Sequence, residues 1–316
     1  MALRVAFFGT PGFAVPTLQH VIRSRHPAVG VITQPDRPRG RGQRTTDGPV
    51  KALALSARLP VFQPERLSRE LFEAPLASLR ADIGVVAAYG KILPDWLLAA
   101  LPRGLINVHA SLLPRYRGAS PIHRAVIAGD RDTGVTIMRV VKALDAGPMI
   151  AAARVPIGPD DTTTMVESLL AIRGAELLVE ALDAIEAGTA VETPQNEALA
   201  TYAPKLTKSE GSVDWTRPAQ DIHNLIRGLW PWPHATTFLD RTRYILHRSR
   251  LSNVAAGAAP PGTVIQASAV DGLHVACGGA TALELLDLQL EGKRVLSARH
   301  SMAAKTLIPG ARFSSP

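Results

Sequence analysis

The sequence is almost free of cysteine. Cys277 is the only one among 316 residues, which excludes an internal disulfide and a multi-cysteine zinc site. A lone thiol is typical of proteins from a reducing compartment. Because free cysteine packs as a small apolar side chain, we expect Cys277, which lies in a strand-like run, to be buried and structural.

Long apolar segments are also missing. No run of about 18 uncharged apolar residues occurs, so the sequence predicts no membrane span. The chain enters a strand-like run soon after Met1 and shows no cleavage-site pattern, so we expect no signal peptide. These features predict a cytoplasmic protein without a membrane partner. The turn at 9–12 lacks the spacing G-x-G-x-x-G, which argues against a nicotinamide-dependent oxidoreductase.

The composition is that of a folded, basic protein. Hydrophobic residues make up 46% and charged residues 20%, enough apolar side chains for a buried core. The net charge is +8, and residues 206–316 hold 12 Lys and Arg against 8 Asp and Glu, so half of the net charge lies there. Basic charge on both parts of the chain allows a polyanion such as RNA to contact both. A purely solubilising role for this charge stays open.

Strand-like and helix-like patterns alternate over the first 150 residues. Such alternation predicts an α/β domain with a Rossmann-like parallel sheet, whose ligands lie beyond the carboxyl ends of the strands. A long helix over 164–187 follows, then a polar stretch with the composition of a linker, and then short strands typical of a small β-rich domain. The expected regions are 1–188, a linker at 189–205, and 206–316. The expected strands of the first region are 3–8, 28–33, 82–88, 104–108 and 134–141.

Two polar side chains stand at the end of one expected strand. Asn107 and His109 share a face of that strand, because side chains alternate in β-structure. An amide can stabilise an oxyanion while an imidazole moves a proton, so the pair suits acyl transfer. Asp145 follows the strand 134–141, so we expect it at the same sheet edge, where its carboxylate would orient the ring of His109. A metal site would need further ligands at suitable spacing, and the sequence shows none.

These residues carry a resemblance to a known family. Asn107, His109 and Asp145, with Ser111-Leu112-Leu113-Pro114 between them, resemble the signature of the folate-dependent formyltransferases. The likeness extends over essentially the whole chain. The branch that acts on methionyl-tRNA is resembled most in the segments 8–11, 33–38, 88–90, 133–138 and 230–233. The resemblance implies transfer of the formyl group of 10-formyltetrahydrofolate to the α-amino group of methionyl initiator tRNA. It also implies an OB-like, tRNA-binding barrel for 206–316.

The resemblance assigns roles to individual residues. His109 is expected to manage the proton of the attacking amine, Asn107 to donate to the formyl oxygen, and Asp145 to polarise His109. The residues expected to form the folate pocket are Val86, Ala88, Tyr89, Gly90, Ser111, Leu112, Leu113 and Pro114. For the segment 111–114, a turn that serves packing alone is the alternative. Neither a metal nor a protein partner is implied.

Four arginines stand close together in a segment rich in Gly and Pro. Such a segment cannot form a helix or a buried strand, so we expect an exposed, mobile loop. The resemblance implies that this loop grips the tRNA acceptor end, and the arginine fork suits phosphate and stacked bases. The expected tRNA-binding residues are Arg37, Arg39, Arg41 and Arg44, of which Arg41 matters most. A loop that only aids solubility is the alternative.

Two further functions stay open on the sequence alone. A formyltransferase that acts on a nucleotide-linked amino sugar would need no arginine-rich loop. A non-catalytic RNA-binding module with a degenerate folate site would have no use for an intact set of Asn107, His109 and Asp145.

Overall fold

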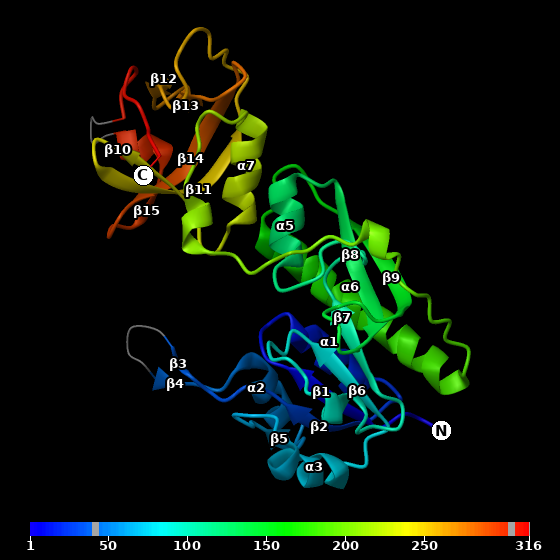
Figure 1. Ribbon diagram of the computed structural model, residues 1–316. Coiled ribbons are helices and arrows are strands. Elements are labelled where there is room, and N and C mark those ends of the chain that lie inside the picture. The colour runs from blue at the N-terminus through cyan, green and yellow to red at the C-terminus, as the bar shows by residue number, and fades with distance from the viewer. Residues whose placement is uncertain (40–43, 303–306, 316) are drawn as a thin grey trace. The chain divides into compact units, whose positions relative to one another are not determined.

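Two large sheets organise the described residues, and a third sheet consists of only two short strands (Figure 1). The computed structural model describes residues 1–39, 44–302 and 307–315, and only the backbone at 38, 39, 44 and 45. The first compact unit comprises Met1–Pro121, Thr133–Pro156 and Glu167–Ala203. The second comprises Ile122–Asp132, Ile157–Val166 and the chain from Pro204 onward. Within the described residues, no helix is long and apolar enough to cross a membrane.

The first unit is built on a seven-stranded sheet with the strand order β5-β2-β1-β6-β7-β8-β9. The neighbours from β5 to β7 are parallel, and β8 is antiparallel to β7. The Rossmann-like expectation is therefore confirmed, with a sheet that is mixed rather than wholly parallel. The strands are β1 Val5–Gly9, β2 Ala28–Ile32, β5 Val61–Phe62, β6 Ile83–Ala87, β7 Leu105–His109, β8 Asp132–Arg139 and β9 Met149–Pro156. The completely buried run of β1 is typical of a central parallel strand.

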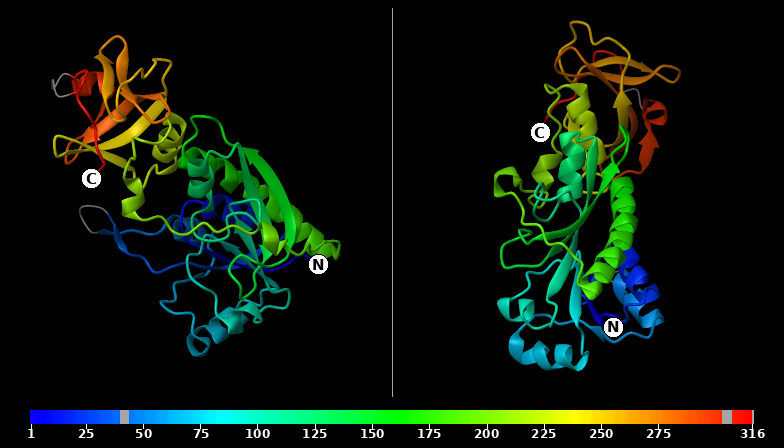
Figure 2. Two further views of the ribbon diagram at one scale, coloured as in Figure 1. Left: turned by 45° about the horizontal axis from the view of Figure 1, so that its top comes forward. Right: turned by 90° about the vertical axis from the view of Figure 1, so that its right-hand side faces the viewer.

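Helices lie on both faces of this sheet (Figures 1 and 2). They are α1 Ala14–Arg23, α2 Pro49–Ser56, α3 Arg69–Ser78, α4 Asp95–Leu98 and α6 Thr163–Ala187. On one face, Phe8 and Leu105 of the sheet pack in one core with Phe72 of α3 and Leu97 of α4. Side chains alternate along a strand, so Asn107 and His109 stand on the same face of β7 as Leu105.

Helix α6 lies against the opposite face of β7 and β8. A Cβ atom on Gly174 would come within 2.8 Å of Cγ1 of Val108 and 3.0 Å of Cγ2 of Val135. Glycine inside a helix is less favourable than alanine by about 1 kcal/mol. Here it permits the helix to approach the sheet directly behind the strand that carries His109.

An antiparallel sheet organises the second unit, in the order β10-β11-β14-β13-β12 with β15 on β14. Its strands are β10 Ala235–Leu239, β11 Thr242–Leu251, β12 Val264–Ser268, β13 Gly272–Ala276, β14 Ala282–Leu290 and β15 Val295–Ser297. Its helices are α5 Pro121–Ala128, α7 Ala219–Gly228 and α8 Ala298–Ser301. Two short 3-10 helices are described as well, Glu197–Leu199 in the first unit and Lys208–Gly211 in the second. Cys277 is 2% exposed, as predicted, and burial raises the pKa of its thiol to about 12.

The segment 311–314 pairs with both edge strands of this sheet. Ser314 and Phe238 of β10 exchange backbone hydrogen bonds of 2.9 and 3.0 Å, and Val264 of β12 donates to Ala311 at 2.8 Å. Pairing both edges protects them from other chains, as closure of a barrel does. The small β-rich domain is confirmed, and its OB-like class stays a prediction.

Two segments from earlier in the chain belong to the second unit. Nη1 of Arg227 on α7 donates to the carbonyl oxygens of Gly158 and Asp161, at 3.1 and 2.9 Å. The hydroxyl of Thr163 donates to the carbonyl of Gly228 at 2.8 Å. These bonds tie the start of α6 to the end of α7.

Candidate active site

His109 ends β7 and is 6% exposed. Its Nε2 atom lies 2.9 Å from the carbonyl oxygen of Tyr116, and its Nδ1 atom lies 3.7 Å from Oδ2 of Asp145. The first contact is a hydrogen bond, and the second is too long for one. Both ring nitrogens thus face oxygen atoms that only accept, so an imidazolium formed during a reaction finds an acceptor on each side.

Asp145 lies in the loop between β8 and β9 with φ +48°, a backbone conformation uncommon outside glycine. Its Oδ2 atom accepts a 2.8 Å hydrogen bond from the backbone N–H of Gly118. Our reason for expecting Asp145 beside His109 was wrong, because β8 runs antiparallel to β7 and ends at the opposite sheet edge. The loop from 140 to 148 turns back and carries the carboxylate to the ring.

Asn107 lies inside β7, opposite Val86 of β6 and Met138 of β8. It is half-buried. Among the described residues its side-chain amide has no hydrogen-bond partner. An uncommitted amide on the same strand face as His109 can donate to a substrate oxygen.

The segment Ser111 to Pro114 forms a turn held by its own residues. The Ser111 hydroxyl donates to the carbonyl of Arg115 at 2.6 Å, and Ser111 is fully buried. Thr136 of β8 donates to the Ser111 carbonyl at 2.7 Å and accepts from the Leu113 N–H at 3.2 Å. Leu112 packs where Gly134 leaves room, since a Cβ there would lie 2.4 Å from its Cδ2 atom. The packing role is therefore present, and the folate role stays a prediction.

The segment after β6 alternates between buried and exposed residues. Val86, inside β6, and Tyr89 are buried, whereas Ala88 and Gly90 are exposed with φ of +46° and +77°. Gln34 donates from its side chain to the Tyr89 carbonyl at 2.8 Å, which fixes this loop. Burial raises the pKa of Tyr89 to about 12, so its hydroxyl stays neutral. Irregular, exposed backbone at Ala88 and Gly90 can present N–H and C=O groups to a flat heterocycle.

The arginine-rich segment is described only in part. Arg37 is exposed, and a two-residue antiparallel pair follows, β3 Pro38–Arg39 with β4 Arg44–Thr45. The expected contact residue Arg41 lies outside the described residues, and only the backbone is described for Arg39 and Arg44.

Two ion pairs that share one lysine join the two ends of this segment. Lys51 on α2 forms ion pairs with Asp36, which precedes the segment, and with Asp47, which follows it, the latter at 2.7 Å. The Lys51 ammonium lowers the pKa of the Asp36 carboxyl, and Asp36 in turn raises the pKa of Lys51. The residues before and after the segment are therefore both held by Lys51.

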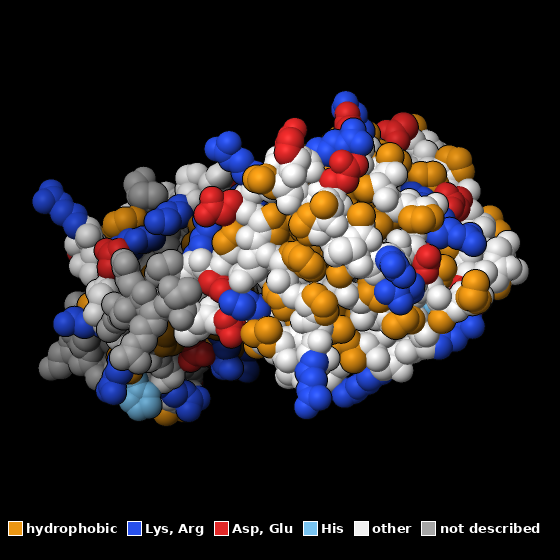
Figure 3. All heavy atoms as spheres, turned by 90° about the horizontal axis from the view of Figure 1, so that it is seen from below, with side chains coloured by type: hydrophobic (Ala, Val, Ile, Leu, Met, Phe, Trp, Pro, Cys, Tyr) orange, Lys and Arg blue, Asp and Glu red, His pale blue; other side chains and the backbone are white. Residues whose placement is uncertain are grey.

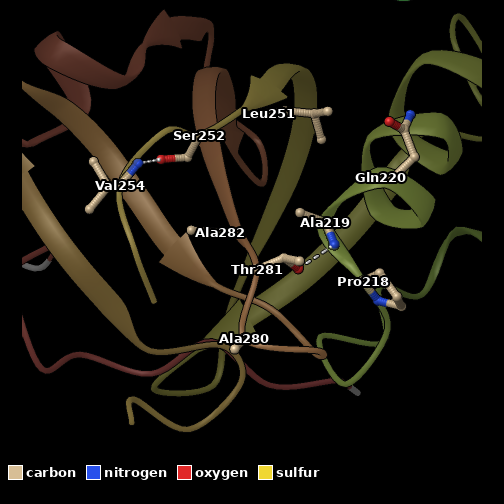
Figure 4. A pocket seen from close by; sticks show the side chains of 9 residues that line it. All are labelled: Pro218, Ala219, Gln220, Leu251, Ser252, Val254, Ala280, Thr281 and Ala282. Carbon is tan, nitrogen blue, oxygen red and sulfur yellow. Dashed lines mark hydrogen bonds between the residues drawn. The ribbon is translucent and has the colours of Figure 1, made fainter. Parts of the chain in front are cut away.

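Other surfaces carry less chemistry. On the face in Figure 3, Lys and Arg side chains are interspersed with Asp and Glu. A pocket of about 340 Å³ in the second unit is lined by residues at the start of α7, at the end of β11 and the loop after it, and at the start of β14 and the loop before it (Figure 4). Its Thr281 hydroxyl is engaged with the Ala219 N–H, and none of its nine lining residues is titratable. The described residues include no cluster of three or more His, Cys, Asp or Glu fit to hold a metal.

The sequence did not reveal the segment from Tyr116 to Gly118 as part of the site. Its contacts to His109 and Asp145 come from a backbone carbonyl and a backbone N–H, which leave no side-chain pattern. The one signal in the sequence is the glycine at position 118. The structure explains it, because Gly118 has φ +119° and a Cβ there would lie 2.8 Å from the carbonyl oxygen of Ala203. Only glycine suits such a position.

Comparison with known proteins agrees with this geometry. A family model described as formyl transferase matches residues 3–182, and one described as formyl transferase, C-terminal domain, matches residues 205–306. A methionyl-tRNA formyltransferase from Geotalea daltonii is 45% identical over 312 residues, covering 98% of each chain. One from Koribacter versatilis is 46% identical over 296 residues, covering 93% of each.

Solved structures share the fold. An N-formyltransferase from Helicobacter canadensis, in complex with folinic acid and dTDP-3-aminofucose, has a TM-score of 0.69 at 16% identity, covering 90% of this chain and 98% of that one. Glycinamide ribonucleotide transformylase 1 from Symbiobacterium toebii has a TM-score of 0.51 at 22% identity, covering 62% and 95%. At these identities the solved structures show the fold alone, whereas the family models and the sequence relatives show the family. The chain therefore belongs to the formyl transferases, and within them to the methionyl-tRNA formyltransferase family.

Proposed function

We propose that the protein transfers the formyl group of 10-formyltetrahydrofolate to the α-amino group of methionyl initiator tRNA. The observation that carries the proposal is the uncommitted amide of Asn107 on the strand face of His109, whose ring has Asp145 on one side and the Tyr116 carbonyl on the other. Relatives of this name match almost the full length of the chain. We further propose that the reaction takes place in the cytoplasm.

The chemistry required is exchange of one C–N bond for another. The amine nitrogen bonds to the formyl carbon, the bond from that carbon to N10 of the folate breaks, and the amine proton ends on N10. His109 is suited to carry this proton, because an oxygen acceptor faces each of its ring nitrogens. Asn107 donates to the formyl oxygen while it carries negative charge, a contribution typically of about 10²–10³ in rate.

The substrates would bind on both sides of these residues. We propose that Ala88, Gly90 and the turn 111–114 hold the folate, with Val86 and Tyr89 as the buried frame beneath. We propose that Arg37, Arg39, Arg41 and Arg44 hold the acceptor end of the tRNA. The regions 1–188, 189–205 and 206–316 would then serve as catalytic domain, linker and tRNA-binding domain.

The test compares three acceptors with 10-formyltetrahydrofolate as donor: methionyl initiator tRNA, free methionine and a nucleotide-linked amino sugar. Formylation of the methionyl-tRNA far above the other two supports the proposal. Preference for the amino sugar would establish the alternative, for which the Helicobacter canadensis protein is a structural neighbour.

A further inference from the structure

The segment that follows α6 contributes to the environment of Asp145. Thr193 and Met149 exchange two backbone hydrogen bonds of 2.8 Å, which pins the segment before residue 195. The backbone carbonyl of Arg117 accepts from the Ala203 N–H at 2.7 Å, and its backbone N–H donates to the Thr201 carbonyl at 2.8 Å. These bonds hold the segment after residue 195. A stretch with the composition of a linker is therefore attached to the first unit on both sides of Gln195.

Gln195 connects this segment to the loop of Asp145. Its Nε2 atom donates to the carbonyl oxygens of both Asp145 and Gly147, each at 2.8 Å. Its Oε1 atom accepts from Nε and Nη2 of Arg117, at 3.0 and 2.8 Å. Both donor positions of this amide are thereby used, and its oxygen is held by the guanidinium.

Arg117 is a buried anchor for that amide. It is 2% exposed, and its guanidinium also forms a two-pronged pair with Glu197, at 2.9 and 2.7 Å. The residues on either side of Arg117 contact the site directly, Tyr116 through its carbonyl to His109 and Gly118 through its N–H to Asp145. One guanidinium therefore fixes the backbone segment beside His109 and, through Gln195, the loop of Asp145.

The backbone of Asp145 needs such support. A non-glycine residue in the left-handed region is strained and persists only where its surroundings hold it there. The two hydrogen bonds from Gln195 lie on either side of Ala146, on the carbonyls of Asp145 and Gly147. They hold the loop in the conformation that directs the carboxylate toward His109.

We propose that Gln195, backed by Arg117, is a positioning residue that places the Asp145 carboxylate beside His109 for the transfer step. The inference rests on the proposed function. It predicts that removal of the Gln195 donors slows the chemical step while both substrates still bind, and that this effect depends on Asp145.

Two variants separate the donors from the shape. Gln195→Met keeps the length and removes every hydrogen bond, while Gln195→Glu still accepts from Arg117 but donates nothing to the two carbonyls. Both should lower the single-turnover rate of formyl transfer to methionyl-tRNA by about 10-fold or more, with dissociation constants for tRNA and folate within about 2-fold. Asn196→Ala is the matched control, since this exposed neighbour of Gln195 contacts, among the described residues, only the Ala198 N–H through its side chain, and it should retain the wild-type rate.

The decisive comparison repeats the Gln195→Glu change in an Asp145→Asn background. If Gln195 acts through the carboxylate, the second change should add less than about 2-fold, because coupled residues are not additive. The inference would be overturned if the rate losses of the two single variants multiply in the double variant. A wild-type rate in Gln195→Glu, or a loss of equal size in Asn196→Ala, would overturn it as well. Folding of each variant is checked by its thermal unfolding midpoint, and Gln195→Glu retains the Arg117 contact should Gln195→Met fail to fold. Wild-type protein that does not formylate methionyl-tRNA would instead refute the proposed function.

Discussion

The Nδ1 atom of His109 lies 3.7 Å from Oδ2 of Asp145. The strand β7, which ends at His109, nevertheless runs opposite to β8, which Asp145 follows. The loop of Asp145 achieves this contact with a left-handed residue and a hydrogen bond to the Gly118 N–H. The carboxylate is thus placed by backbone contacts as much as by the strand order.

Asp145→Asn tests the charge of this carboxylate. The amide keeps the shape and can still accept from the Gly118 N–H, so the fold should be retained. The ring of His109 loses the carboxylate beside it, which stabilises the charge that develops during transfer, and the single-turnover rate should fall by about 10-fold or more. Unchanged transfer would mean that Asp145 serves only to build the loop.

Arg41→Ala tests the arginine-rich segment. If the arginine grips a phosphate of the acceptor end, transfer to methionyl-tRNA should fall strongly. The salt dependence of tRNA binding should also flatten, by about 0.7–0.9 log units per decade of salt for each phosphate that the variant no longer binds. The matched control is Arg23→Ala, which removes one exposed arginine from the last turn of α1. Equal behaviour of the two variants would leave the segment with a solubilising role alone.

Asp36→Asn tests, as a function of pH, the ion pair between Asp36 and Lys51 at the base of that segment. The Lys51 ammonium lowers the pKa of the Asp36 carboxyl in the folded protein. Its stabilisation is therefore present above the ordinary pKa of about 4 and disappears as the pH falls through the lower folded-state pKa. The thermal midpoint of Asp36→Asn should lie below wild type at neutral pH, and the gap should close on acidification.

The control for this experiment is Asp95→Asn, which breaks an exposed pair with Lys142 and should change the midpoint little at any pH. A gap between wild type and Asp36→Asn that stays constant from neutral pH to about pH 3 would contradict the linkage.

Gly174→Ala tests the packing of α6 behind the active-site strand. Alanine improves helix propensity by about 1 kcal/mol. The new methyl group would lie 2.8 Å from Val108, and such overpacking costs about 1–3 kcal/mol. The free energy of unfolding in urea should therefore decrease. An increase would show that α6 can shift away from the sheet without loss.

The elements were largely predictable from the sequence because their patterns are local. The apolar runs of β1, β2, β6, β7 and β8 and the long helix α6 appear within a few residues of the expected bounds. The direction of β8 was not predictable, since periodicity shows where a strand lies and not which way it runs. The strand β9 was missed because its three consecutive alanines and its final proline give only a weak strand signal.

The site was predictable where side chains carry the chemistry and unpredictable where the backbone does. Asn107 and His109 are polar side chains in an apolar strand, and Asp145 stands in the loop after another, so the sequence shows their pattern. The carbonyl of Tyr116 and the N–H of Gly118 belong to groups that every residue has. Gln195 and Arg117 are distant in sequence from each other, and only the fold brings them together beside the loop of Asp145.

The most direct test is the single-turnover rate of formyl transfer from 10-formyltetrahydrofolate to methionyl initiator tRNA, measured for wild type, Asn107→Ala and His109→Ala. The account predicts that each substitution lowers this rate by at least about 10², the size typical of an oxyanion donor, while the affinity for tRNA stays near that of wild type. Near-normal rates in both variants would contradict the assignment of the reaction to this pair of residues.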